Sequence, residues 1–182
     1  FMLVMTMPLG GISGGTQSIL SYNYGARQFG RVRDAQKKIF RLCMGFTAIM
    51  FVLARAAGPL FVRLFTKDAQ VAEISACAIR VCTLAAIPLG AQYEIVDGFT
   101  ALGQAQIALP LSFWRKAVYF AALFALPAVF GARAIFYAEP VSDVLGPAVS
   151  AAAYFLFMDR LLQRRKAAAG IRHWQQGQTP GA

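Results

Sequence analysis

Residues 8–27 read PLGGISGGTQSILSYNYGAR and contain the most informative pattern in the chain. The segment is apolar and rich in glycine, and it leads directly into a basic stretch that begins at Arg27. An apolar run of this kind can span a bilayer, and its glycines let neighbouring helices or a solute approach closely. Lys and Arg concentrate in cytoplasmic loops. The segment therefore predicts a membrane helix that is followed by a cytoplasmic connection.

The overall composition supports a membrane protein. The 182 residues are 58% hydrophobic and 14% charged, whereas soluble domains are about 45–50% apolar and about 25% charged. The net charge of +10 gathers beside apolar segments, which favours membrane lipid over nucleic acid as a partner. Cys43, Cys77 and Cys82 lie in apolar segments without metal-ligand spacing, and the single histidine is His173 in the tail. We therefore expect no metal site and no cofactor.

Five segments of the chain are apolar enough to cross a membrane, which takes about 20 residues. None of them alternates apolar and polar residues, which favours helices over strands. The short connections force antiparallel neighbours, which predicts an all-α polytopic membrane bundle. Residues 163–182 are expected to form a basic tail that is disordered at its end. The predicted helices cover about 1–24, 39–65, 74–102, 107–130 and 134–162.

The positive charges lie mostly on one side of such a bundle. The first connection with its flank and the tail, which five antiparallel helices place together, carry eleven Lys and Arg residues against three on the other side. The positive-inside rule therefore predicts a multi-pass protein of the cytoplasmic (inner) membrane with a cytoplasmic C-terminus. The eleven are Arg27, Arg31, Arg33, Lys37, Lys38, Arg41, Arg160, Arg164, Arg165, Lys166 and Arg172, and the three are Arg63, Lys67 and Arg133.

Several short motifs follow one another in a characteristic order. Gln17 to Arg27 is close to the pattern Q-(P/S)-I-(I/L)-x-Y-N-Y-G-A-(K/R). Four further motifs follow at matching spacing, which are LFTKD at 64–68, DGFTALGQ at 97–104, SFWR at 112–115 and EPVSD at 139–143. In this order they resemble helices eight to twelve of the multidrug and toxic compound extrusion (MATE) family.

The resemblance implies five helices of the C-terminal six-helix lobe of a twelve-helix transporter. The partner of the chain would then be the missing amino-terminal lobe of the same protein. The implied function is export of small-molecule organic cations or drugs by alternating access, through antiport against H⁺ or Na⁺, and not an enzymatic reaction. Two alternatives stay open: a lipid-linked oligosaccharide flippase of the same superfamily, and a membrane subunit that does not transport.

Glu94 and Asp97 are the main candidates for cation coupling or substrate binding. They are three residues apart on one helix face, and ionisable groups inside a membrane are costly enough to suggest a function. Two poorly solvated carboxylates this close do not both ionise easily, so a proton or Na⁺ could exchange with a cationic solute. The alternative is that they line an aqueous vestibule or pair with Arg115 or Lys116. The resemblance also favours acidic residues on this helix, facing a central cavity.

Gln17 is a further candidate for substrate contact, because it places an amide on an apolar helix. Tyr22, Asn23 and Tyr93 are secondary candidates for binding a cation or a flat drug. For Tyr22, at the cytoplasmic boundary, an interfacial aromatic position is favoured instead.

Pro88 should kink the third helix and is a candidate hinge, or else a static bend. Glu139 and Asp143 could line the outer mouth of the cavity, but solvation at the membrane interface is favoured for both. Arg115 or Lys116 could instead keep a carboxylate ionised, which would weaken the coupling argument.

Overall fold

The computed structural model describes residues 1–176, with side chains described up to Arg164. These residues form α-helices and one short 3₁₀ helix, without a strand in the described range, which confirms the all-α fold class. The elements are α1 (Met2–Gly15), α2 (Gln17–Gly25), α3 (Phe29–Arg63), α4 (Ala69–Cys82), α5 (Ala86–Ala101), α6 (Ala105–Phe130), η1 (Ala132–Tyr137) and α7 (Ala138–Gln176).

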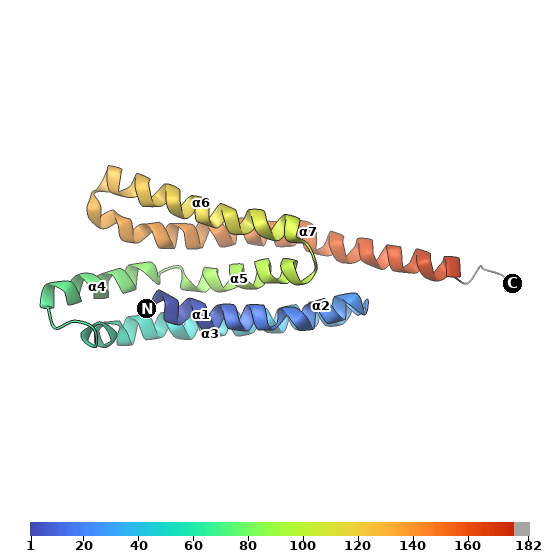
Figure 1. Cartoon of the computed structure of the whole chain (residues 1–182), viewed down its shortest axis with the longest axis horizontal. Coiled ribbons are helices and arrows are strands. Elements are labelled where there is room, and N and C mark those ends of the chain that lie inside the picture. Colours follow the sequence, from blue (N-terminus) through green and yellow to red (C-terminus); the bar gives the residue numbers. More distant parts are fainter. Residues whose placement is uncertain (177–182) are drawn as a thin grey trace.

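The helices form an elongated bundle with α5 at its centre. Figure 1 shows α1, α2 and α3 along one side of α5, and α6 and α7 along the other. Helix α5 packs against all five of these helices. A polar residue on α5 is therefore surrounded by other helices, and its position decides which neighbours it meets.

Three of the described helices are long and apolar enough to cross a membrane: α3, α6 and the segment Ala132–Arg164. The bent pair α4 and α5 passes the same test as a single span, which makes four. Helices α1 and α2 have 14 and 9 residues, so neither alone has the ~20 residues of a span. Figure 1 shows them following one another beside α3.

Helix α3 begins well before the expected start of the second apolar segment at 39. Most of the predicted loop 25–38 is helical, and only 26–28 separate α2 from α3. The buried positions Phe29, Val32, Gln36 and Ile39 recur every three or four residues, so the basic stretch is the exposed face of an amphipathic helix. Mean hydropathy did not reveal this part of the helix, because polar residues on the exposed face lower the average although the buried face is apolar.

The third expected helix, 74–102, is not continuous. Helices α4 and α5 meet at an angle of 51° across Thr83–Ala85. The expected kink at Pro88 therefore lies about one turn earlier in the chain. A proline ring clashes with the carbonyl four residues before it and cannot donate a hydrogen bond, so the helix breaks ahead of Pro88. Pro88 itself sits in the first turn of α5, where proline is tolerated.

Two other expected boundaries change. The first helix, 1–24, is divided at Thr16, whose hydroxyl donates to the carbonyls of Ile12 and Ser13 at 2.9 Å each. The tail is helical as far as Gln176, because α7 continues past 162. The predicted disorder at 177–182 lies outside the described residues.

Candidate functional site

Two cavities lie against different faces of the central helix α5. The first, of about 420 Å³, is bounded by α1, α5 and α6 and is called the α1–α5–α6 cavity. The second, of about 470 Å³, is bounded by α3, α5 and α7 and is called the α3–α5–α7 cavity. No residue of α5 lines both cavities, so each polar side chain at a cavity belongs to one of the two.

Asp97 lines the α1–α5–α6 cavity together with Tyr93, and both lie on α5. The side chains of Ser13 and Gln17 lie beside the Asp97 carboxyl. The structure thus brings two of the candidate residues close together, Gln17 of α2 and Asp97 of α5. It also adds Ser13, a buried hydroxyl that the sequence did not single out.

Glycines on α1 shape the same cavity. Gly10 and Gly14 line it, and a Cβ at Gly10 would lie 3.7 Å from the Tyr93 ring. A Cβ at Gly14 would meet nothing within 4 Å. The missing side chains therefore leave open space beside Tyr93 and Asp97, where a flat or cationic solute could sit.

Glu94 faces the other cavity. Its side chain is only 2% exposed and lines the α3–α5–α7 cavity with Gln36 of α3. Both side chains border Gly98, since a Cβ there would lie 2.8 Å from Gln36 Nε2 and 3.8 Å from Glu94 Oε1. The acidic pair predicted as one site is therefore divided between two cavities, because residues three apart on a helix differ by about 60° in direction.

The polar atoms around Glu94 are incompletely paired. The Gln36 side chain lies beside the Glu94 carboxyl, but among the described side chains neither Glu94 Oε1 nor the amide atoms of Gln36 form a hydrogen bond of good geometry. Buried polar groups are nearly always satisfied, so a cavity with several free acceptors is suited to a donor from outside the chain.

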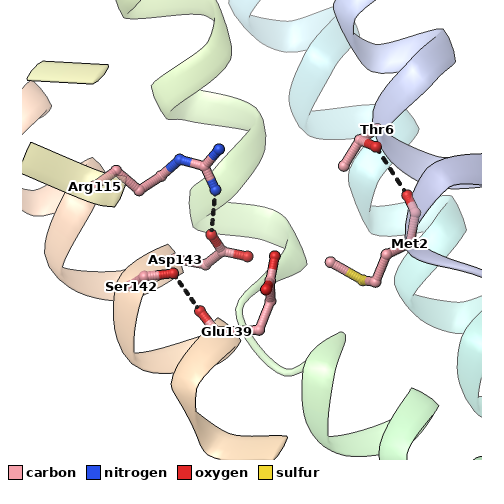
Figure 2. Close-up of polar contacts among 6 residues, drawn as sticks. All are labelled: Met2, Thr6, Arg115, Glu139, Ser142 and Asp143. Atoms are coloured by element: carbon pink, nitrogen blue, oxygen red, sulfur yellow. Dashed lines mark hydrogen bonds and ion pairs between the residues drawn. The ribbon is translucent and has the colours of Figure 1, made fainter. Parts of the chain in front are cut away.

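A buried ion pair joins α6 to α7. Arg115 Nη1 donates to Asp143 Oδ1 at 3.0 Å, and the Asp143 side chain is fully buried (Figure 2). The expectation that Asp143 is solvated at the interface is therefore wrong, because α5 and α6 both pack against α7 and the side chain is buried between helices. Arg115 is occupied by Asp143, and no described side-chain contact joins it to Glu94 or Asp97.

Gly146 allows this arrangement. A Cβ at Gly146 would collide with Gln92 Oε1 of α5 and would lie 2.9 Å from Arg115 Cγ. Glycine therefore lets the Arg115 side chain cross α7 to reach Asp143. Gln92 is buried, its side-chain oxygen has no hydrogen-bond partner among the described residues, and it lines the α1–α5–α6 cavity.

Two of the secondary candidates, Tyr22 and Asn23, line neither cavity. Tyr22 is 76% exposed, in line with an interfacial aromatic position. The Asn23 amide donates to the Ile19 carbonyl of its own helix at 2.8 Å. Lys116, in contrast, lines the α1–α5–α6 cavity.

No cluster of three His, Cys, Asp or Glu side chains that could hold a metal occurs among the described residues.

Sequence reasoning missed Gln36 and Gln92, which supply buried amides to the two cavities. Gln36 lies between Val32 and Ile39 on the buried face of α3. The helical spacing of these three residues could have indicated from the sequence that the Gln36 side chain is buried. Gln92 carried the same signal as Gln17, an amide on an otherwise apolar helix, and it lies two residues before Glu94.

These features define a polytopic membrane protein with one buried and one half-buried carboxylate beside two cavities. The family model described as MatE matches residues 1–115, more than half of the chain. The chain belongs to the MatE family, whose members are integral membrane transporters and not enzymes.

Relatives and solved structures agree with this assignment. The multidrug export protein MepA of Staphylococcus aureus (strain MSSA476) is 22% identical over 151 residues, which cover 83% of this chain and 33% of that protein. The MATE multidrug transporter DinF-BH, solved in complex with a ligand, is 28% identical, with a TM-score of 0.81, over 88% of this chain and 36% of the other.

A second solved structure shows the same fold. It is an inward-facing multidrug resistance MATE family transporter of the MOP superfamily, 15% identical with a TM-score of 0.78, over 88% of this chain and 38% of the other. The chain thus spans about a third of the length of the relatives that it matches.

Proposed function

We propose that this chain forms part of a secondary transporter that exports organic cations or drugs in exchange for H⁺ or Na⁺. The observation that carries the proposal is Asp97, a carboxylate beside Gln17 and Tyr93 in an open cavity between helices. A relative described as a multidrug export protein and a solved structure described as a multidrug transporter support the substrate class.

The chemistry needs a carboxylate that accepts one cation at a time. Asp97 would hold the cationic group of a solute, Gln17 would add an amide contact, and the Tyr93 ring would offer a cation–π face. Arrival of a proton or Na⁺ at the carboxylate removes the charge that holds the solute. Glu94, on the other face of the same helix, would respond to the coupling ion through the second cavity.

The proposed placement follows from charge. The chain would lie in the cytoplasmic membrane with its C-terminus in the cytoplasm, as the distribution of Lys and Arg indicates. Its partner would be the remainder of the transporter, because an alternating cavity needs a second lobe. A flippase for lipid-linked oligosaccharides is disfavoured, since such a cavity would need several free cations for a pyrophosphate. In the α1–α5–α6 cavity Arg115 is paired with Asp143, which leaves Lys116 beside the acidic Asp97.

The test is ethidium efflux from cells that carry the complete gene, with the H⁺ and Na⁺ gradients collapsed in turn. We expect efflux to stop when one of the two gradients is removed. We expect Asp97→Asn to weaken apparent substrate affinity about 10- to 100-fold, since hydrogen bonds to charged groups contribute about 1.5–3 kcal/mol. Glu94→Gln should reduce the dependence on the ion gradient.

A matched control is Glu73→Gln, an exposed carboxylate on α4 that lines neither cavity. It should leave efflux unchanged. Normal cation-coupled efflux in both Asp97→Asn and Glu94→Gln would refute the assignment of the two carboxylates. Efflux that depends on neither gradient would refute the antiporter.

A further inference from the structure

We propose that the α3–α5–α7 cavity binds the headgroup of a phospholipid with a primary ammonium group, of the phosphatidylethanolamine type, from the cytoplasmic leaflet. The ammonium group would enter the cavity, the phosphate would stay at its rim, and the acyl chains would remain in the bilayer. The inference rests on the orientation proposed above and does not depend on transport. At Glu94 the ammonium group and the proposed coupling ion would compete for the same carboxylate.

The rim of the cavity carries two free cations. Lys37 and Arg41 are one turn apart on α3, line the cavity and are exposed. Neither forms an ion pair with a described side chain, whereas Arg33, one turn earlier, is paired with Asp159 of α7. A phosphate placed between Lys37 and Arg41 would therefore receive two charge-assisted contacts that the chain itself leaves unused.

The inner part of the cavity carries acceptors that lack a donor. Glu94 Oε1 and Gln36 Oε1 are buried without a well-formed hydrogen bond among the described residues, although the Gln36 side chain lies beside the Glu94 carboxyl. The half-buried Tyr154 of α7 also lines the cavity. A primary ammonium group has three N–H donors and one positive charge, which matches two or three acceptors that include a carboxylate. A trimethylammonium group has the charge but no donor, and a glycerol headgroup has donors but no charge.

The distribution of charge sets the direction of the headgroup. The cationic side chains lie at the exposed rim, and the carboxylate lies in the buried part. In phosphatidylethanolamine the ammonium ends the headgroup and the phosphate links it to the tails, so the lipid's polarity matches that of the cavity. Phe40 and Phe155, exposed apolar side chains at the same cavity, would contact the acyl chains.

The location of the cavity agrees with a lipid of the cytoplasmic leaflet. Gln36, Lys37 and Arg41 lie in the first half of α3, which starts at the basic, cytoplasmic end. Apolar side chains that remain exposed around it are typical of a lipid-facing surface. A headgroup could thus enter sideways from the bilayer without crossing the bundle.

The experiment uses the complete protein, purified in mild detergent and stripped of lipid. Phosphatidylethanolamine, phosphatidylcholine and phosphatidylglycerol with identical acyl chains are titrated separately, and bound lipid is counted by native mass spectrometry. We expect phosphatidylethanolamine to bind about tenfold more tightly than either other lipid, because a lost charged hydrogen bond costs about this factor. Equal binding of all three, or tighter binding of phosphatidylglycerol, would overturn the proposal.

Variants assign the binding to this cavity. The double variant Lys37→Gln/Arg41→Gln should lose most of the bound phosphatidylethanolamine, and Glu94→Gln should lose the preference over phosphatidylcholine. The double variant Arg31→Gln/Lys38→Gln removes the same charge from α3 outside the cavity and should keep both. Equal losses in the two double variants would show a general charge effect and refute the site.

The two proposals can fail separately. Lipid binding is measured without a gradient or a drug, so absence of efflux does not affect it. A thermal melt of each variant confirms that it is folded, and the single variant Arg41→Gln provides a milder change. Unaltered binding of phosphatidylethanolamine by a folded Lys37→Gln/Arg41→Gln protein contradicts the inference even if efflux is fully cation-coupled.

Discussion

At the residue scale, the buried pair of Arg115 and Asp143 links α6 to α7. The two groups meet at 3.0 Å, and Asp143 keeps a second buried oxygen without a partner among the described residues. Breaking a buried pair leaves an uncompensated charge, which typically costs about 3–5 kcal/mol. The pair is therefore a point where a single substitution should have a large effect on folding.

We predict that Arg115→Met destabilises the protein by about 3–5 kcal/mol, because it leaves the Asp143 carboxylate buried alone. The double variant Arg115→Met/Asp143→Leu should recover much of this loss, since both charges are removed together. The measurement is thermal unfolding of the purified variants in detergent. A control is Lys116→Met, the exposed neighbour of Arg115. Equal melting temperatures for Arg115→Met and Lys116→Met would contradict the prediction.

Residue-scale reasoning from the sequence reached the right carboxylates but not their surroundings. The cost of a charge in the membrane marked Glu94 and Asp97 without any structure. Their separation into two cavities, with Gln17 beside one and Gln36 beside the other, depends on which helices pack against α5. Their role in coupling stays a prediction.

At the element scale, α3 and α5 approach closely because of a glycine. A Cβ at Gly90 of α5 would lie 2.8 Å from Thr47 Oγ1 and 3.2 Å from the Cys43 carbonyl oxygen of α3. Thr47 is fully buried, and its hydroxyl donates to the Cys43 carbonyl at 3.0 Å. The site has no room for a methyl group unless the helices separate.

We predict that Gly90→Ala lowers stability by about 1–3 kcal/mol, the usual cost of overpacking. Gly11→Ala is the matched control, because a Cβ at Gly11 meets nothing within 4 Å and alanine favours a helix by about 1 kcal/mol. Thermal unfolding measures both. A loss in Gly11→Ala as large as in Gly90→Ala would show that the close approach is not the cause.

The break between α4 and α5 is a second feature at this scale. Pro88 predicted a bend, and the bend of 51° lies about one turn before it. The sequence located the cause, whereas the place where the backbone bends depends on how the first turn of α5 packs. Whether this bend acts as a hinge stays a prediction.

At the scale of the whole molecule, the orientation in the membrane can be tested with introduced cysteines. The three native cysteines are first replaced by alanine, since Cys77 is exposed. We predict that an impermeant maleimide added outside intact cells labels Lys67→Cys but not Gln28→Cys, because the basic connection lies in the cytoplasm. Permeabilised cells should label both. Labelling of Gln28→Cys from outside would reverse the orientation.

The sequence by itself determined the class of fold, the central acidic helix and the family, because apolar length, charge cost and ordered motifs are local properties of the chain. Mean hydropathy could not show that α3 begins with an amphipathic stretch. No local pattern in the sequence showed that Asp143 is buried. Only the tertiary structure decided that Glu94 and Asp97 open to separate cavities and that Arg115 pairs with Asp143. Those outcomes depend on which helix faces pack together, and distant segments contribute the partners.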